Sequence, residues 1–485
     1  HALYDSERGV TKELKSQTAG AESTENRISS FNSNGFTLTG NTETNYSGDE
    51  YVSWTFRKAP KFFDIVTYTG NGASNRQINH DLGATPALII VKVTSATGDW
   101  NTIARISDTS YSFGLELNST NVQYAATNPS STVSSTWFVP EYFTGSVSEM
   151  NAAGTTYVAY LFADNTAEDV DDQMIKCGSF TTNSSGGATV NLGWQPQFLI
   201  FKIASGTADG WYMFDTMRDF AASTSSALFA NTSAAEASSN GNTKVTSNGF
   251  DISNQQNSVT YIYMAVRAPM MAEPDAATDV FAVDTRGSTG DGKEPGLRSG
   301  FPVDMALRRA GFSGSSAGYL DSRMFQGQQL ETSSTQSEQV NSRTMFDYQN
   351  GYYNLGSTYA DQIGQMWKRA KGFFDVVPYT ANSSEYPTGQ NVPHSLGVVP
   401  EMMWVKCLSN STDWVVYHSF TGNTKGTFLN VNGTPNTFSY YWNDDTPTAT
   451  EFTLGGSTET SNINYTYIAY LFATLAGISK VGSYT

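Results

Sequence analysis

The chain has 485 residues, a formal net charge of −17, two cysteines and 13% aromatic residues. This length predicts several domains, and an acidic chain without a basic stripe argues against nucleic acid as a partner, because it repels phosphate groups. Cys177 and Cys407 predict neither a disulfide framework nor a metal site, and the longest apolar run, residues 467–478, is too short for membrane insertion. Both cysteines are expected to be small buried residues or free thiols.

Residues 1–60 are predicted to be the back half of a β-sandwich module. The first residues, HALYDSERG, align with the later stretch WYMFDTMRD, which places Asp5 on Asp215 and Arg8 on Arg218. We interpret both pairs as structural ion pairs that hold a turn. The alignment also predicts that the sequence begins in mid-repeat, as an interior piece of a longer chain.

Residues 61–163 carry the signals of one complete β-sandwich module. An apolar opening strand ends at a Gly-Asn-Gly turn and is followed by HDLGATPALIIVK (80–92). Within this stretch Gly83 permits a left-handed backbone, and Pro86 marks the entrance of an apolar strand. Trp100 comes after a turn-like stretch and predicts a hairpin, and the apolar run YVAYLFA closes the module.

The same frame returns in residues 174–269 and 372–473. Each copy carries the motif L-G-x-x-P, an apolar strand that ends in lysine, and a tryptophan shortly after it. The equivalent residues are Pro86, Pro196 and Pro400; Lys92, Lys202 and Lys406; and Trp100, Trp211 and Trp414. We predict that the three units share one strand order, with the prolines at equivalent strand entrances.

Residues 278–371 are predicted to be a divergent module with an insertion. The stretch VFAVDTRG resembles the Asp/Arg element through Asp284 and Arg286, and no L-G-x-x-P motif is recognised there. The stretches FPVDMALRR and YADQIGQMWKRA are predicted to form short helices. The last residues, 477–485, resemble an opening strand and are predicted to begin a following module.

The sequence therefore predicts an all-β fold. Units of roughly a hundred residues with many turns are typical of antiparallel β-sandwiches. We expect a tandem array of such modules, of jelly-roll or lectin-like type, with short helices in the insertion of one of them.

Few residues could carry chemistry, and each has a structural interpretation. His80 and His394 share a repeat position that Val190 takes in another copy, so loop histidines are favoured over ligands or catalytic bases. The repeated lysines are predicted to pair with an acid or to reach out of the sandwich, and the tryptophans to pack in cores or interfaces rather than on sugars. A GDG stretch (290–292) is a weak calcium signal, EDVDDQ (168–173) is interpreted as a solvated linker, and no metal or cofactor is predicted.

Several motifs occur together: GFFDVV, PEMMWVK, the D-x-R-G element and the run YLFATLAGISKVGSYT. As a set they resemble the repetitive tail proteins of marine tailed bacteriophages, notably those of cyanobacteria. The resemblance covers nearly the whole chain and implies a virion structural protein, a tail fibre or related tail appendage that helps to contact the host. It offers no catalytic residues to carry over, and residues 174–269 depart from its pattern at Val190.

We therefore expect a non-enzymatic protein of the virion tail that attaches to a host cell-surface glycan or protein. Other tail proteins and a homotrimeric assembly are its expected partners. The contact site is predicted in residues 287–361, which add length and polar and aromatic side chains to the generic module. The candidate receptor-binding residues are Arg308, Arg309, Tyr348, Tyr352 and Tyr353, of which the arginines could hold acidic groups and the tyrosines could stack on sugars.

Three alternatives stay open at this point. The insertion could merely pack against a neighbouring module or chain. The protein could be a polysaccharide depolymerase, which needs two carboxylates facing across a cleft, with Asp304, Asp321 and Asp347 as the available acids. It could also be a bacterial surface adhesin or a capsid-decorating protein.

Overall fold

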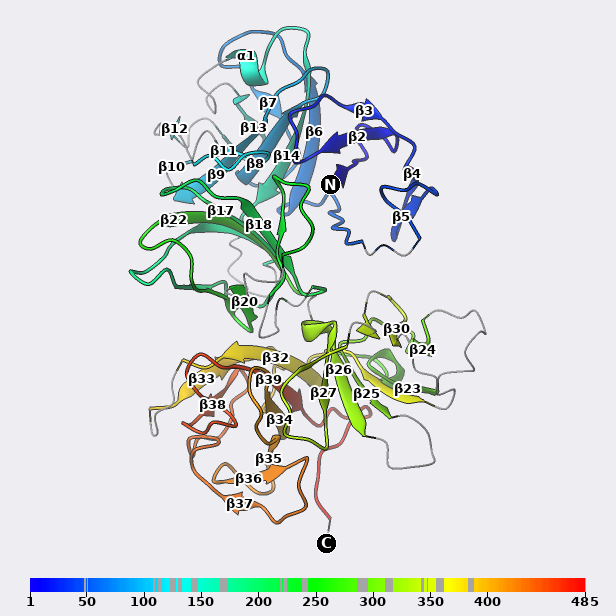
Figure 1. Ribbon diagram of the computed structural model, residues 1–485, viewed down its shortest axis with the longest axis vertical. Helices are drawn as coiled ribbons and strands as arrows, with labels where there is room; N and C mark the ends of the chain where they lie inside the picture. The colour runs from blue at the N-terminus through cyan, green and yellow to red at the C-terminus, as the bar shows by residue number, and fades with distance from the viewer. Residues whose placement is uncertain are drawn as a thin grey trace.

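The computed structural model of the chain is elongated and built almost entirely of β-strands (Figure 1). It describes residues 1–485 except 48, 50, 108–109, 112–114, 123–127, 130–132, 141–146, 166–172, 219, 221–224, 238–242, 270, 286–294, 310–316, 342–343, 347, 355–361, 383–387 and 485. Within these described residues the helical segments are short: α1 (Val147–Met150), η4 (Ala277–Asp279) and η5 (Arg323–Phe325). The predicted all-β fold is confirmed.

The first module, residues 61–163, is a seven-stranded antiparallel sheet with a two-stranded sheet beside it. The order of the large sheet is β12-β10-β9-β8-β14-β6, with β11 also paired to β9. The opening strand therefore lies next to the closing strand, and the proline-led strand follows. The strands are β6 (Phe63–Thr69), β7 (Ile78–Asn79), β8 (Pro86–Val93), β9 (Trp100–Ser107), β10 (Ser110–Tyr111), β11 (Leu115–Glu116), β12 (Asn128–Pro129), β13 (Trp137–Phe138) and β14 (Thr156–Ala163).

The second module, residues 174–269, repeats this order as β15-β22-β17-β18-β19, with a small sheet β16-β21-β20. Its proline-led strand begins at Pro196, as β8 begins at Pro86. The strands are β15 (Ile175–Thr181), β16 (Ala188–Asn191), β17 (Pro196–Ile203), β18 (Trp211–Asp215), β19 (Leu228–Phe229), β20 (Thr243–Thr246), β21 (Gly249–Ile252) and β22 (Thr260–Arg267).

The fourth module, residues 372–473, has the order β32-β39-β34-β35-β36-β37 and a small sheet β33-β38. Pro400 stands just before its proline-led strand. The shared strand order predicted for these three units is confirmed. The strands are β32 (Phe374–Thr380), β33 (Gln390–Pro393), β34 (Met402–Cys407), β35 (Val415–His418), β36 (Lys425–Phe428), β37 (Asn436–Thr437), β38 (Glu451–Leu454) and β39 (Thr466–Phe472).

The small sheets form the second layer of each sandwich. In the fourth module Val392 of β33 and Phe452 and Leu454 of β38 belong to the same buried cluster as Val405 and Tyr467 of the large sheet. Apolar side chains on alternate positions of both sheets thus meet in one core, as expected for packed sheets.

The third module, residues 278–371, has the same order, β23-β31-β25-β26-β27-β28, with a small sheet β24-β30-β29. Two predictions of short helices are wrong here: FPVDMALRR supplies strand β25, and the described residues of YADQIGQMWKRA, 362–370, supply strand β31. The two strands pair with each other along their full length. The strands are β23 (Phe281–Thr285), β24 (Leu297–Arg298), β25 (Met305–Arg309), β26 (Gly318–Ser322), β27 (Gln328–Glu331), β28 (Gln339–Val340), β29 (Thr344–Met345), β30 (Gly351–Asn354) and β31 (Ile363–Trp367).

Asp284 is also not the Asp/Arg element of the third module. It lies on the opening strand β23, where its carboxylate accepts the N–H of Thr285 and that of Arg298 at 2.8 Å each. Asp64 and Asp375 on the other opening strands make the same two kinds of bond. The predicted partner, Arg286, lies outside the described residues.

The N-terminal unit, residues 1–60, contains the sheet β1-β2-β3 and the hairpin β4-β5. Residues 51–57 have the sequence of a closing strand and alternate between exposed and half-buried side chains, but they are not assigned to a strand. In complete modules this segment pairs with the opening strand. The strands are β1 (Ala2–Leu3), β2 (Lys12–Lys15), β3 (Ser23–Thr24), β4 (Ile28–Asn32) and β5 (Gly35–Leu38).

Residues 477–484 of the predicted opening strand at 477–485 are likewise not assigned to a strand. Leu475 and Ser479 make the isolated bridge that Ala59 and Phe63 make at the first junction, and residues 480–484 are not assigned to a strand. In the four modules, each opening strand pairs with the closing strand of its own module.

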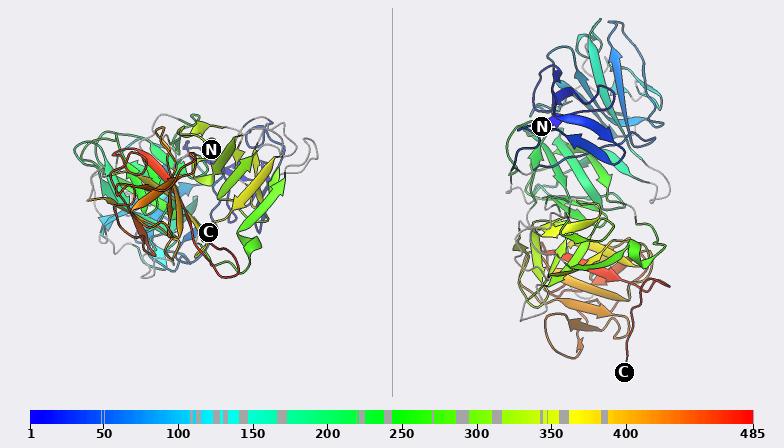
Figure 2. Two further views of the ribbon diagram at one scale, coloured as in Figure 1. Left: turned by 90° about the horizontal axis from the view of Figure 1, so that it is seen from below. Right: turned by 90° about the vertical axis from the view of Figure 1, so that its right-hand side faces the viewer.

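The units are arranged in two tiers along the long axis (Figures 1 and 2). The N-terminal unit and the first and second modules form one tier, and the third and fourth modules lie side by side in the other. One buried apolar cluster joins the units of the first tier, and a second cluster joins the second module to the third and fourth. No helix in the described residues has the length and apolar character needed to cross a membrane.

Candidate functional site: the module interfaces

The repeated lysines join the first, second and fourth modules to the unit that precedes each of them. Their side chains are fully buried, and each Nζ donates to two main-chain carbonyl groups. Lys92 Nζ lies 2.7 Å from Gly98 O in its own hairpin loop and 3.1 Å from Ala19 O in the N-terminal unit. The equivalent acceptors are Asp209 O and Thr120 O for Lys202, and Thr412 O and Thr335 O for Lys406.

Burial changes the protonation of these amines. Desolvation lowers the pKa of Lys92, Lys202 and Lys406 from 10.5 to about 8, and nearby charges oppose this only in part. The prediction that the lysines pair with an acid or reach solvent is therefore wrong. Two main-chain carbonyls take the place of an acidic partner or of water, because they accept two of the N–H bonds of each buried amine.

The repeated tryptophans make a parallel set of bonds. Trp100 and Trp211 lie directly opposite Lys92 and Lys202 on the neighbouring strand. Each indole Nε1 donates across the module boundary: Trp100 to Lys15 O and Thr18 O at 3.1 Å, Trp211 to Glu116 O at 2.8 Å and Trp414 to Glu331 O at 3.0 Å. The prediction of core or interface packing is confirmed.

The carbonyls that receive these bonds come from equivalent places. We call residues 15–19, 116–120 and 331–335 the acceptor segments, and the donors opposite them the lysine–tryptophan pairs. In each case the tryptophan bonds the first residue of the segment and the lysine bonds the last. One interface is thus repeated three times along the chain.

The Asp/Arg elements add a third contact to the interface. Asp5 pairs with Arg8 at 2.6 Å and accepts the Tyr160 hydroxyl of the first module at 2.7 Å. In the second module, Asp215 pairs with Arg218 at 2.8 Å. Both pairs are structural ion pairs, as predicted.

The N-terminal unit closes the first tier into a ring. Trp54 takes the place of Tyr160 in its closing segment, and its Nε1 donates to Asp215 of the second module at 3.0 Å. Ser16 Oγ donates to Ala230 O of the second module at 2.8 Å. The first module docks on the N-terminal unit, the second on the first, and the N-terminal unit on the second.

The third module departs from this interface. Arg308 stands opposite Tyr319 on the neighbouring strand, where the other modules have lysine and tryptophan. Its guanidinium lies 4.6 Å from the Tyr319 ring centre and 2.6 Å from Asp321, and it also bonds Gln329. All these partners belong to the third module. The fourth module docks on the third in the usual way, and Asp321 adds to the effect of burial in raising the pKa of Tyr470, the counterpart of Tyr160.

The sequence matches one known family, described as a domain of unknown function (DUF7483), over residues 1–269 and 310–485. The chain belongs to this family. The stretch outside the match, residues 270–309, contains the opening strand β23 and the whole of β25 with Arg308, which replaces the repeated lysine. No curated protein and no solved structure significantly matches the chain.

The predicted receptor-binding residues are not brought together at one exposed surface. Arg308 is held by Asp321, and Tyr352 is buried and stacks on Phe346 at 5.2 Å, so neither is available to a receptor. Arg309 is exposed and Tyr348 is half-buried. The side chain of Tyr353 lies outside the described residues. Arg308 and Arg309 have different surroundings because successive residues of a strand face opposite sides of the sheet. The sequence did not reveal this difference, because it predicted a helix for both arginines.

The repeated histidines have a structural role. His80 and His394 are buried, and each Nδ1 accepts the N–H of the residue two positions later at 3.3 Å, while Nε2 faces a carbonyl oxygen at 3.2–3.3 Å. These bonds fix the tautomer with hydrogen on Nε2. Burial lowers both pKa values, and the loop interpretation stands.

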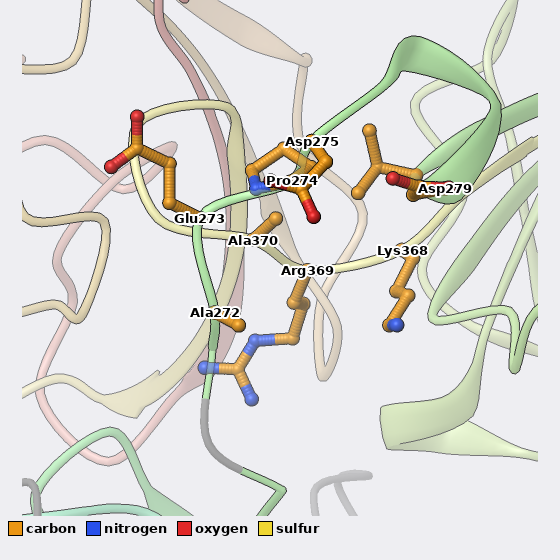
Figure 3. A pocket seen from close by; sticks show the side chains of 9 residues that line it. Ala272, Glu273, Pro274, Asp275, Asp279, Lys368, Arg369 and Ala370 are labelled. Carbon is orange, nitrogen blue, oxygen red and sulfur yellow. The ribbon is translucent and has the colours of Figure 1, made fainter.

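Two surface cavities are lined by charged residues. One, of about 270 Å³, lies between the segment that joins the second and third modules and the segment that joins the third and fourth (Figure 3). Figure 3 shows Glu273 and Asp275 on one side and Lys368 and Arg369 on the other. Arg369 is bound to Asp375 at 2.7 Å. The other cavity, of about 410 Å³, lies between the N-terminal unit and the first module.

The carboxylates considered for a depolymerase either bond other residues of the third module or its junction, or lie outside the described residues. Asp321 is fully buried and bound to Arg308, and Asp304 accepts the N–H of Arg369 at 2.7 Å and lies 3.4 Å from Arg323. Asp347, the calcium-like stretch and the 168–173 linker lie largely or wholly outside the described residues. Among the described residues there is no group of His, Cys, Asp and Glu that could hold a metal ion, and Cys177 and Cys407 are free and buried.

Proposed function

We propose that the chain is a structural segment of a tail fibre or tail appendage of a tailed bacteriophage. Its modules would hold a host-contacting surface at a set distance from the particle, and the contact would be to a surface glycan or protein. One observation carries the proposal: the repeated lysines, tryptophans and Asp/Arg pairs all form hydrogen bonds to neighbouring units.

The resemblance to marine phage tail proteins supports the same proposal. A tail appendage needs length and stiffness more than a catalytic centre. Buried bonds between successive modules resist bending, because each would leave an unsatisfied donor or acceptor if it opened. Exposed side chains of the third module, such as Arg309, are candidates for the host contact, since loops and edges on a rigid scaffold are the usual binding surface.

Gold-labelled antibody against the protein, applied to purified phage particles, tests the location. We expect label on the tail. Label on the capsid would favour the decorating-protein alternative and would contradict this proposal.

Adsorption tests the contact. The soluble protein, added in excess, should slow adsorption of the phage to its host, and the Arg309→Ala variant should compete less well. Lys425→Ala, which changes an exposed cation of the fourth module, is the matched control. Undiminished adsorption at saturating protein would remove host contact from the proposal and leave only the spacer role.

A further inference from the structure

The fourth module has an acceptor segment of its own, residues 428–432. Leu429 N donates to Trp414 O at 3.2 Å, as Leu117 N donates to Trp100 O at 2.9 Å in the first module. The next residue is asparagine in both modules, and its side-chain oxygen accepts the N–H of the same tryptophan, at 2.9 Å for Asn118 and 3.0 Å for Asn430. Phe428 and Asn432 therefore hold the places of Glu116 and Thr120.

The two equivalent surfaces differ in what covers them. Leu117 is 6% exposed beneath the second module, whereas Leu429 is 38% exposed. Around Leu429, three more large apolar side chains face solvent: Val431, Phe438 and Tyr440, at 51%, 41% and 42% exposure. Phe438 packs on Tyr440 and Tyr441 at 5.1 and 4.7 Å, so the patch is an ordered surface. Contiguous exposed apolar patches of this kind mark interaction sites.

We propose that residues 428–432 and the apolar patch beside them dock a further module of this same type. Its tryptophan Nε1–H would bond the carbonyl of Phe428, and its lysine Nζ the carbonyl of Asn432. The three acceptor segments already described each receive such a pair. The proposal goes beyond the tail function, because it concerns how modules are added to the array.

The first tier shows which arrangement a docked module would complete in the second tier. In the first tier three units close a ring, and each contacts the other two. The third and fourth modules form two-thirds of the same arrangement, joined by Lys406 and Trp414. A module docked on residues 428–432 would take the third place.

A second copy of this chain does not fit this surface in the same way. Its lysine–tryptophan pairs, at 92/100, 202/211 and 406/414, are all engaged inside the copy itself. In the third module the corresponding residues, Arg308 and Tyr319, bind each other and Asp321. The occupant is therefore a module whose pair is not yet engaged.

Extension of the full chain tests the proposal. Ser479 is equivalent to Phe63, because the two residues make the same isolated bridge at their junctions. In the extended chain, a second copy of residues 64–173 therefore follows Ser479 and replaces residues 480–485. This appended module carries a second Lys92 and Trp100 without a second N-terminal unit. Hydroxyl-radical footprinting read by mass spectrometry should show a severalfold loss of labelling at Leu429 and Phe438, towards the level at Leu117.

The control extension carries Lys92→Met and Trp100→Phe in the appended copy only, and it should leave Leu429 labelled. A second extension, which joins residues 375–473 after Ser479, supplies Lys406 and Trp414 instead, so the test does not depend on one appended module. Unchanged labelling of Leu429 in both extensions would overturn the proposal. Light scattering of the unextended protein is the last check: a dimer with Leu429 protected would overturn it in favour of a second copy.

Discussion

Lys92, Lys202 and Lys406 are buried amines that meet carbonyl oxygens instead of carboxylates. A neutral amine keeps two N–H donors, which equals the number of carbonyls that each Nζ bonds. The lowered pKa, about 8 for each, means that the folded protein releases these protons well before an unfolded chain would. Both the neutral amine and the ammonium therefore have enough N–H donors for the two carbonyls.

Stability should depend on pH through these lysines. Between about pH 8 and pH 10 the unfolded chain binds more protons at these positions than the folded protein, so the free energy of unfolding should rise with pH. Below about pH 8 the desolvation penalty is fully present. Urea unfolding followed by circular dichroism across this range measures the trend.

The triple variant Lys92→Met, Lys202→Met, Lys406→Met is the reference for that experiment. It should lack the rise, while buried tyrosines such as Tyr160, whose pKa burial raises, lower stability above about pH 10 in both proteins. An identical pH dependence of the two proteins between about pH 8 and pH 10 would rule out titration of the lysines in this window.

Arg308 and Arg309 are adjacent residues with opposite surroundings, and they should respond differently to substitution. Arg308→Met removes the guanidinium that is bound to the buried Asp321 carboxylate and should lower the free energy of unfolding by about 3–5 kcal/mol. Arg309→Met should change it by less than about 0.5 kcal/mol. Adding Asp321→Leu to Arg308→Met should recover most of the loss, and no recovery would show that the arginine acts by packing alone.

At the scale of single residues, the sequence predicted which positions matter better than what they bind. Recurrence identified the lysines, tryptophans and Asp/Arg pairs. Their acceptors are main-chain carbonyls, such as those of Lys15, Glu116 and Glu331, and a main-chain acceptor requires no particular side chain. The burial of Arg308 and Tyr352 was not predicted, because it depends on how strands β25 and β30 pair with their neighbours.

At the scale of elements, four modules share one order of strands, with the opening and closing strands as neighbours. The alternation and turn signals were sufficient to predict this for three of them. The third was misread because its turn is one residue shorter, Gly300-Phe301-Pro302, and because arginine and tyrosine replace lysine and tryptophan. Its strands β25 and β31 also contain good helix formers, and their mutual ladder outweighed that propensity.

The tryptophan bonds should couple neighbouring modules in a measurable way. Trp211→Phe removes the indole donor from the Glu116 carbonyl, which keeps the N–H of Ser119 at 3.1 Å, and should cost about 0.5–1.5 kcal/mol. The effect should appear as faster hydrogen exchange in both the first and second modules. Trp442→Phe is the matched control, because the Trp442 indole donates to Lys425 O within its own module. Effects of Trp211→Phe confined to the second module would contradict the coupling.

At the scale of the whole molecule, three units arranged head to tail close a ring within a single polypeptide. Trp54 helps to close it beside the Ser16–Ala230 bond, since its Nε1 donates to Asp215 and its ring packs on Phe198 at 5.7 Å.

Opening the ring should release the N-terminal unit before anything else unfolds. Trp54→Phe should speed hydrogen exchange in residues 51–58 and their cleavage by trypsin at Arg57 and Lys58, with little change in the fourth module. Trp404→Phe, which alters a half-buried ring packed on Phe472 of its own module, serves as the control. Equal sensitivity of the two variants in residues 51–58 would argue against ring closure by Trp54.

The use of main-chain carbonyls as acceptors has an evolutionary consequence. A carbonyl is present at every residue, so residues 15–19, 116–120 and 331–335 can diverge in sequence without losing the bonds that they accept. Recombination that deletes, duplicates or exchanges modules therefore requires no compensating substitution in the neighbour. A gene built this way can change the number and the exposed loops of its modules in one step, while the joints between them stay compatible.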